Sequence, residues 1–196
     1  LGKSGEVLEG WRSALLEALG PNARLVTDLI PELRLIIGEP PAVAELEPQQ
    51  AQRRFLLVFR RFIGVFARAE HPLALFLDDL QWLDAATLDL LEDLLTRSEL
   101  HHMMLVGAYR DNEVDVSHPL TRKLQSIRQA GVRIEEIRLT PLALAHIEQL
   151  IAEALRCPPP SVVELARLVQ DKTAGNPFFV IQFLQSLAEE ELLSYD

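Results

Sequence analysis

The stretch LALFLDDLQWLD, Leu73 to Asp84, joins a short, unbroken apolar run to a pair of acidic residues. The run is too short to form a helix of its own, and it is bounded by Pro72 and Asp78. Continuous apolarity over such a length is typical of a parallel strand covered on both faces. The stretch therefore predicts an α/β fold with a buried strand over residues 73–77.

The two acids have a chemical interpretation at this position. In open parallel sheets, ligands bind at the carboxyl ends of the strands. There Asp78 could hold Mg²⁺, usually through water, and Asp79 could orient or deprotonate an attacking water. This is the physical content of a Walker B element. The alternative is that both acids merely end the strand and begin a turn.

Two further apolar runs extend the pattern. Residues 103–109 are predicted as a second buried strand, and residues 133–139 as a third strand nearer an edge. Helices are predicted between them, over 85–95 with Asp84 as the cap and over 119–130. Strand, helix, strand, helix, strand is the signature of a parallel sheet with flanking helices.

The segments on either side of this core are expected to be helical. A polar loop should precede a helix over 11–19, followed by helical pieces over 25–37 and a long helix from Pro48. The apolar residues of the long helix recur at helical spacing and should face a core, opposite a solvated face of arginines. These arginines are Arg53, Arg54, Arg60, Arg61 and Arg68.

Two further motifs complete the candidate site. Arg110 follows the second strand, on the same predicted edge as Asp78, where a guanidinium could contact a terminal phosphate. Its alternative is a surface arginine paired with Asp111 or Glu113. The stretch KTAGNPFFV has two interpretations. Local chemistry explains it if Gly175 ends one helix and Pro177 begins the next. In the functional interpretation, this junction lies over a nucleotide.

Composition restricts the partners and the compartment. The net charge is −10, which argues against binding to nucleic acid or to a membrane surface. A single cysteine, Cys157, excludes an internal disulfide and fits a reducing compartment, so we expect a cytoplasmic protein. His101 and His102 lack further ligands at metal spacing. The chain begins without Met, and we expect it to be a fragment.

The opening residues LGKSG contain the Gly-Lys-Ser core of a phosphate-binding loop. Such a loop follows a buried strand and opens a helix, and nothing precedes Leu1. Two acids and two glycines then occupy the turns that would carry the phosphate. We therefore expect Lys3 to lie in a polar loop rather than in a nucleotide site.

Several stretches resemble one known family. LALFLDDLQWLDAATLDLL, MLVGAYRDNEV and KTAGNPFFVIQFL resemble the AAA-like ATPase module of bacterial multidomain sensor proteins. Those proteins combine a serine/threonine-kinase-like domain, this module, a GAF domain and a histidine kinase. The module belongs to the signal-transduction (STAND) ATPases, related to the ATPase part of MalT-like regulators.

The resemblance implies roles for the matching residues. Asp78 would bind Mg²⁺, Asp79 would orient the attacking water, and Arg110 would be the sensor arginine. Gly175 and Pro177 would form the lid motif that contacts ATP. Leu1–Gly5 would match a helical insertion, so the chain would be an incomplete P-loop NTPase sheet that lacks its phosphate-binding loop.

The resemblance also implies three regions and a setting. They would be a helical insertion and following helix over 1–70, an α/β ATPase core over 71–140 and a helical lid over 141–196. The parent protein would be a Mg²⁺-dependent ATPase that couples nucleotide state to neighbouring signalling domains, while this fragment alone would be inactive. The alternative is a non-hydrolysing scaffold or self-association module. A helical transcription-factor core is disfavoured by the acidic charge.

Overall fold

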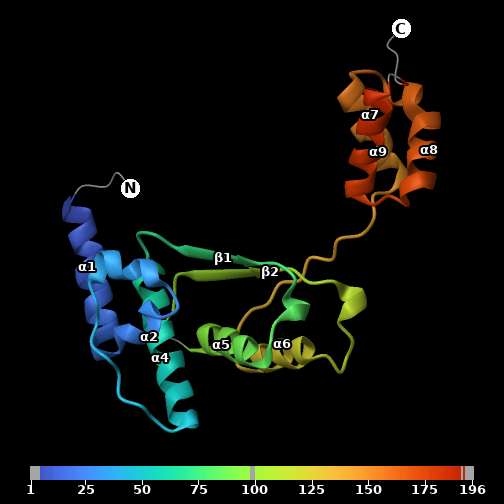
Figure 1. Cartoon of the computed structure of the whole chain (residues 1–196). Coiled ribbons are helices and arrows are strands. Elements are labelled where there is room, and N and C mark those ends of the chain that lie inside the picture. The colour runs from blue at the N-terminus through green and yellow to red at the C-terminus, as the bar shows by residue number, and fades with distance from the viewer. Residues whose placement is uncertain (1–4, 98–99, 191, 193–196) are drawn as a thin grey trace. The chain divides into compact units, whose positions relative to one another are not determined.

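The structure is a computed structural model that describes residues 5–97, 100–190 and 192. The chain divides into two compact units, Leu1–Ile134 and Glu135–Asp196, and each is described by itself. Figure 1 labels their helices and strands.

The first unit begins with four helices around one apolar core. These helices are α1 (Gly5–Leu19), α2 (Ala23–Thr27), α3 (Arg34–Ile37) and α4 (Pro48–Phe66). Fully or nearly fully buried core residues come from α1, α2 and α4, namely Leu15, Leu19, Val26, Val58 and Phe62. The expected helical pieces after Leu19 and the long helix from Pro48 are thus confirmed.

The start of α1 differs from the sequence prediction. A polar loop was predicted before Trp11, but the helix already begins at Gly5. Each glycine costs a helix interior about 1 kcal/mol relative to alanine. The Trp11 ring stacks on Phe66 of α4 with 5.4 Å between centroids, and such packing supplies most of a helix's stability in a protein. Tertiary packing therefore overrides the local cost of Gly10, which lies inside the helix.

Arg60 also departs from the prediction that the α4 arginines form a solvated face. The residue is buried, and its Nη1 lies 2.7 Å from Asp93 Oδ2 on α5 (Ala85–Thr96). Both side chains are about nine-tenths buried. A buried guanidinium needs such a partner, because an uncompensated buried charge is strongly destabilising. This ion pair joins α4 to α5.

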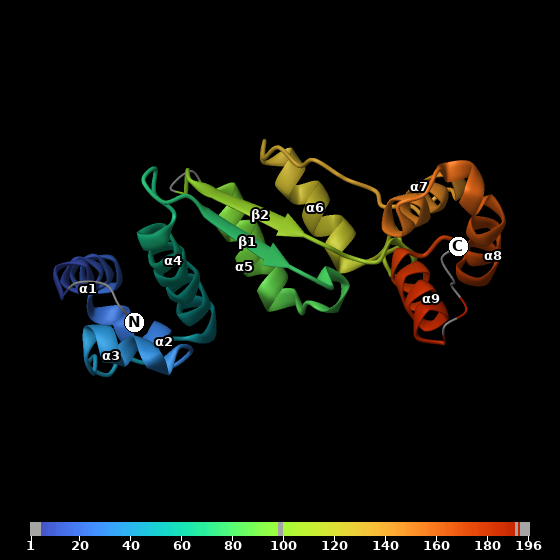
Figure 2. The same cartoon turned by 90° about the horizontal axis from the view of Figure 1, so that it is seen from above.

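Two parallel strands form the sheet of the first unit. They are β1 (Leu73–Leu77) and β2 (Met103–Gly107), paired in register from Leu73 opposite Met103 to Leu77 opposite Gly107. Helix α5 connects them, and α6 (Pro119–Gln129) follows β2. Figures 1 and 2 show α5 and α6 on the same side of the sheet. The first two predicted strands and both predicted helices are confirmed.

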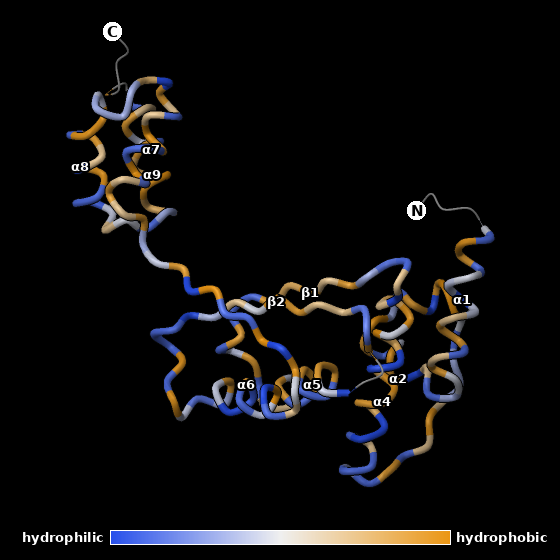
Figure 3. Tube along the Cα trace, turned by 180° about the vertical axis from the view of Figure 1, so that it is seen from behind, coloured by the Kyte–Doolittle hydropathy of each residue, from blue (hydrophilic) through white to orange (hydrophobic). Residues whose placement is uncertain are grey.

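The sheet is covered on one face rather than on both. Leu73, Leu75 and Leu77 are partly buried, whereas Phe76 and Met104 on the opposite face are 66% and 59% exposed. Figure 3 draws both strands largely in the colours of apolar residues. The expectation of a strand buried on both faces is therefore wrong for the described residues, because α5 and α6 cover only one of them.

The third predicted strand is wrong. Residues 132–140 have no regular secondary structure, and Ile137 and Leu139 are 87% and 90% exposed. The alternation of apolar and polar residues fits a strand, but a strand forms only against a neighbouring strand. Among the described residues, β1 and β2 pair with each other alone. Residues 132–140 pair with neither strand, so their local pattern does not produce a strand.

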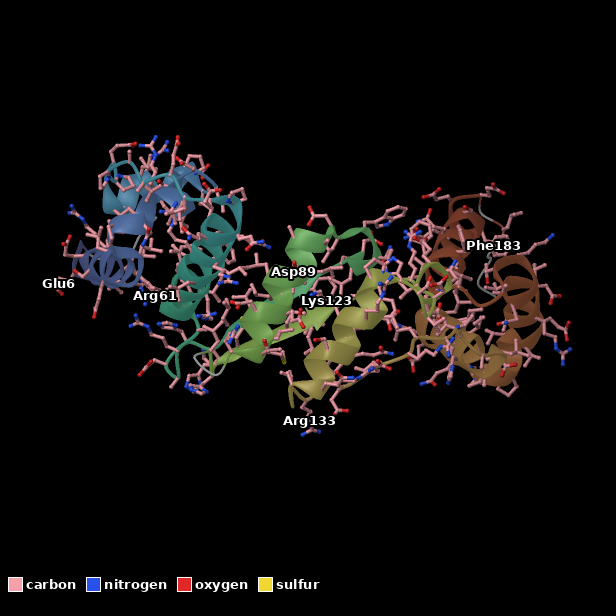
Figure 4. All side chains as sticks on the ribbon, turned by 90° about the horizontal axis from the view of Figure 1, so that it is seen from below. Glu6, Arg61, Asp89, Lys123, Arg133 and Phe183 are labelled. Atoms are coloured by element: carbon pink, nitrogen blue, oxygen red, sulfur yellow. The ribbon has the colours of Figure 1, made fainter. Side chains whose placement is uncertain are left out.

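Helices α5 and α6 are fixed to one another by charge. Lys123 Nζ lies 2.6 Å from Asp89 Oδ1 and also contacts Glu92, which accepts a hydrogen bond from Ser126. Figure 4 labels Asp89 and Lys123 on the two helices. Hydrogen bonds from Lys123 and then Ser126 lower the pKa of Glu92. Asp89 and then Glu92 raise the pKa of Lys123.

The second unit contains three α-helices in its described residues. They are α7 (Leu144–Leu155), α8 (Val163–Thr173) and α9 (Pro177–Glu189). Their shared core is apolar, and its fully buried members are Ile147, Ile151, Ala166, Val169 and Val180. The helical character predicted after Pro141 is confirmed.

Candidate functional site

The carboxyl ends of the two strands meet, as parallel pairing requires. Beyond the paired strands, the Ala108 N–H donates to the Leu77 carbonyl at 2.8 Å. The Leu80 N–H then donates to the Ala108 carbonyl at 2.9 Å. These bonds bring the turn after β1 against the turn after β2. Asp78, Asp79 and Arg110 consequently lie at one edge of the sheet.

Asp78 is an exposed carboxylate at the first position after β1. Its Oδ1 accepts a hydrogen bond from the Asp79 N–H at 2.9 Å. Within the described residues, no group of three or more histidine, cysteine or acidic residues could hold a metal ion. Mg²⁺ commonly keeps several waters and binds through one or two carboxylates plus substrate phosphates, a donor set that a single exposed carboxylate fits.

Asp79 has a left-handed backbone, with φ 53° and ψ 44°. Aspartate is one of the few residue types that tolerate this conformation. Its Oδ1 accepts a hydrogen bond from Gln81 Nε2 at 2.8 Å and lies 3.6 Å from Arg110 Nε. The turn therefore places this carboxylate beside the arginine that follows β2.

Arg110 has two acidic neighbours. Besides Asp79, its Nη1 lies 3.2 Å from Glu113 Oε1. The pairing of Arg110 with Glu113, the alternative that the sequence offered, is confirmed, while contact of Arg110 with a terminal phosphate stays a prediction. The guanidinium is 62% exposed in its side chain, so it is accessible to an anion.

Gln81 is a site residue that the sequence prediction missed. It is only 8% exposed, and its Oε1 accepts a hydrogen bond from the Arg110 backbone N–H at 3.3 Å. Since Nε2 donates to Asp79, one side chain links both turns. In the sequence, the one feature that could have indicated a role for Gln81 is its position two residues after Asp79.

A hollow of about 410 Å³ adjoins these residues. It is lined by Gln81, Trp82, Glu113 and His118. The Trp82 side chain is largely open, with the residue 74% exposed. His118 Nδ1 accepts a hydrogen bond from the Leu120 N–H at 3.1 Å and so caps α6. The hollow thus extends from the acidic turn to the start of α6.

The first helix after the acids is capped as predicted. Asp84 Oδ1 accepts a hydrogen bond from the Thr87 N–H at 2.7 Å. That backbone contact, followed by a side-chain contact with Thr87, lowers the pKa of Asp84. The cap fixes where α5 begins, and with it the length of the turn that carries Asp78 and Asp79.

Gly175 and Pro177 belong to the second unit. Gly175 has φ +75°, and its carbonyl accepts a hydrogen bond from the Leu142 N–H at 2.7 Å. Pro177 begins α9, and Asn176 Oδ1 accepts from the Phe178 N–H at 3.0 Å. The local explanation of this junction as a helix end and a helix start is confirmed. Its contact with a nucleotide stays a prediction.

The opening motif is described only from its last residue. Leu1–Ser4, including Lys3, lie outside the described residues. Gly5 is the first residue of α1. The expectation that Lys3 lies away from the acids therefore stays a prediction.

Comparison with known proteins identifies the family of the chain. The AAA ATPase domain family matches residues 1–106, more than half of the chain. The chain belongs to the AAA ATPase domain family. The match includes β1, both acids and most of β2.

One relative of the chain is a signalling protein. The chain is 26% identical over 258 residues to hybrid signal transduction histidine kinase G of Dictyostelium discoideum. The alignment covers 96% of the chain but only 7% of that kinase. No solved structure matches the chain. None of its described helices is both long and apolar enough to cross a membrane.

Proposed function

We propose that this AAA domain is part of a nucleotide-dependent signalling switch that binds and hydrolyses ATP. The observation that carries the proposal is the juxtaposition of Asp79 and Arg110, with Asp78 beside them, at the carboxyl ends of two parallel strands. Family membership supports it, because AAA domains are ATPases by description.

Each side chain takes a separate role. In hydrolysis the terminal phosphoryl group of ATP would pass to water and ADP would leave, and bound Mg²⁺ would offset charge on the phosphates. Asp78 offers a carboxylate oxygen to the metal, directly or through water. Asp79 orients the attacking water and accepts its proton, while Arg110 contacts the terminal phosphate and offsets its negative charge. Asp78 therefore corresponds to the Mg²⁺-binding acid of a Walker B element.

The second unit supplies the remaining roles. Gly175 and Pro177 contact the nucleotide from the lid, and residues 141–196 act as that lid. Residues 1–70 form a helical insertion, and residues 71–140 form the core. The phosphate-cradling loop lies outside Leu1–Gly5, in another part of a longer protein.

We further propose that the longer protein is a sensor kinase or regulator of the STAND class, bacterial and cytoplasmic. ATP binding to this domain would then control neighbouring signalling domains of the same chain. The similarity to a signal transduction histidine kinase supports the signalling role alone.

One observation favours a second candidate, a non-hydrolysing scaffold. The open sheet face carries exposed Phe76, Met104 and Val106, an apolar surface that suits association with another protein or a second copy. This candidate predicts that loss of the acids leaves signalling intact.

The Asp79→Asn variant of the full-length natural protein that contains this chain tests the proposal. The amide keeps the size of the side chain but accepts no proton, so ATP binding should persist while turnover falls about 100-fold or more. Binding is measured with a labelled nucleotide, and turnover by phosphate release. Glu45→Gln, in the exposed loop before α4, removes the same charge and should leave both unchanged. Unchanged turnover in Asp79→Asn would remove Asp79 from the mechanism.

A further inference from the structure

Gln81 has a buried side-chain amide that binds two turns, the one after β1 and the one after β2. Its Nε2 donates to Asp79 Oδ1 at 2.8 Å, and its Oε1 accepts from the Arg110 N–H at 3.3 Å. The residue is 8% exposed, so its polar atoms need partners within the protein. Its surroundings satisfy both ends of the amide.

The pair of contacts depends on the chemistry of the amide. One end of glutamine donates and the other accepts, at a fixed separation. Glutamate at position 81 would place a second carboxylate against Asp79, although it could still accept from the Arg110 N–H. Methionine has a similar length but no N–H donor. Asparagine is one methylene shorter and would not span the two turns.

The contacts of Asp79 leave one of its oxygens available. Gln81 Nε2 and Arg110 Nε both approach Oδ1. Among the described residues, no group donates a hydrogen bond to Oδ2, and the side chain is 49% exposed. One oxygen is thus held by the protein, while the other has no donor among the described residues on a side chain that is half exposed.

We propose that Gln81 is a positioning residue for Asp79, an inference that rests on the proposed function. By holding Oδ1, the amide fixes the rotation of the carboxylate, so that Oδ2 accepts the proton of the attacking water. The same amide binds the main chain of Arg110. The orientation of Asp79 is therefore coupled to the turn whose arginine contacts the terminal phosphate.

The test compares Gln81→Met and Gln81→Glu in the full-length natural protein that contains this chain. Both remove the donor to Asp79, so both should lower kcat for ATP hydrolysis about tenfold to 100-fold, the usual cost of losing a group that orients a reactive one. KM for ATP should stay within about twofold, because Gln81 itself touches neither metal nor phosphate in this proposal. Gln125→Met, on the exposed face of α6, is the matched control and should change neither constant.

A second readout does not require turnover. In the nitrogen-15 NMR spectrum of the 196-residue chain, the Arg110 amide resonance should shift in Gln81→Met, which removes its acceptor. It should stay closer to its original position in Gln81→Glu, which keeps an acceptor oxygen. If Gln81→Met fails to fold, Gln81→Glu still tests the contact with Asp79.

The outcomes separate the two proposals. If Asp79→Asn abolishes turnover while both Gln81 variants keep the wild-type kcat, the positioning role is overturned and the proposed function stands. If Asp79→Asn leaves turnover unchanged, Asp79 is removed from the mechanism and its positioning by Gln81 is overturned with it. If the wild-type protein neither binds nor hydrolyses ATP, the proposed function itself fails. A fall in kcat with an equal rise in KM would indicate general damage to the site and would also overturn the positioning role.

Discussion

The left-handed backbone of Asp79 is stabilised by the contacts that it permits. This conformation costs a residue other than glycine about 1–2 kcal/mol. The turn gains the hydrogen bond from the Leu80 N–H to the Ala108 carbonyl and the bond between Gln81 and Asp79. Each contributes about 1 kcal/mol net. The strain and the gain from these two bonds are therefore similar in size, and the bond from the Trp82 N–H to the Asp79 carbonyl at 3.0 Å stabilises the turn further.

Gly175 is the position in the second unit where adding a methyl group should lower the free energy of unfolding most. An added Cβ would lie 2.3 Å from the Leu142 carbonyl oxygen, at a backbone with φ +75°. Gly175→Ala should lower the free energy of unfolding by about 2 kcal/mol or more, since strain and a backbone clash add. Urea unfolding followed by circular dichroism measures it.

Gly20→Ala is the matched control for that substitution. Gly20 also has a positive φ, +51°, but nothing lies within 4 Å of the added Cβ. It should cost only about 1 kcal/mol, from backbone strain alone. Equal losses in the two variants would show that the contact with Leu142 does not matter.

The sequence could predict the charged residues of the candidate site but not Gln81, the residue that binds them. Asp79 and Arg110 each follow an apolar run, and parallel strands bring such positions together. Gln81 carries no charge and has no recognisable spacing to a partner. Its importance arises from burial between two turns, which depends on the tertiary structure.

At the scale of elements, the sequence predicted the features that depend on neighbouring residues, such as where helices begin. It did not predict the features that depend on residues far away in the chain. Asp84 at the start of α5 and Pro48 at the start of α4 act through their own neighbours. Residues 132–140 show a strand pattern, yet a strand needs a partner that local sequence cannot supply. The burial of Arg60 likewise depends on Asp93, 33 residues away.

The contact between α5 and α6 should depend on pH. The lowered pKa of Glu92 adds stability that is present above its unfolded pKa and is lost as pH falls through the lowered value. The raised pKa of Lys123 adds stability that is present below its unfolded pKa and is lost as pH rises through the raised value. The stabilisation is therefore fullest near neutral pH and declines in acid and in strong base.

Lys123→Met tests this contact. The variant should lower the free energy of unfolding by about 1 kcal/mol at neutral pH, as expected for a partly exposed ion pair. It should lose less stability than the wild type in acid, because Glu92 no longer has its partner. Urea unfolding at several pH values measures both effects. Arg61→Met, an exposed cation on α4, should leave the pH dependence unchanged.

At the scale of the whole molecule, charge and the open sheet face affect function in different ways. The net charge of −10 opposes the approach of any phosphate, although salt screens this over about 8–10 Å. The face with Phe76 and Met104 instead favours contact with apolar protein surface. Nucleotide binding therefore needs a concentrated set of donors, whereas protein contact does not.

The last prediction is that the 196-residue chain binds ATP weakly or not at all and that Lys3 is dispensable. Most phosphate affinity in such sites comes from a cradle of backbone N–H groups, a lysine and a helix N-terminus. In residues 5–97 and 100–190, no glycine-rich loop leads from a strand into a helix. Asp78 and Asp79 cannot replace the cradle, because they repel phosphate unless Mg²⁺ intervenes.

Calorimetric titration with ATP and Mg²⁺ measures this binding. The wild-type chain and its Lys3→Ala variant should give the same weak heats, and Arg61→Ala serves as a control for the loss of one positive charge. Tight binding that disappears in Lys3→Ala alone would identify Leu1–Gly5 as a working phosphate loop. That result would make the assignment of these residues to a helical insertion wrong, while leaving the roles of Asp79 and Arg110 open to the hydrolysis test.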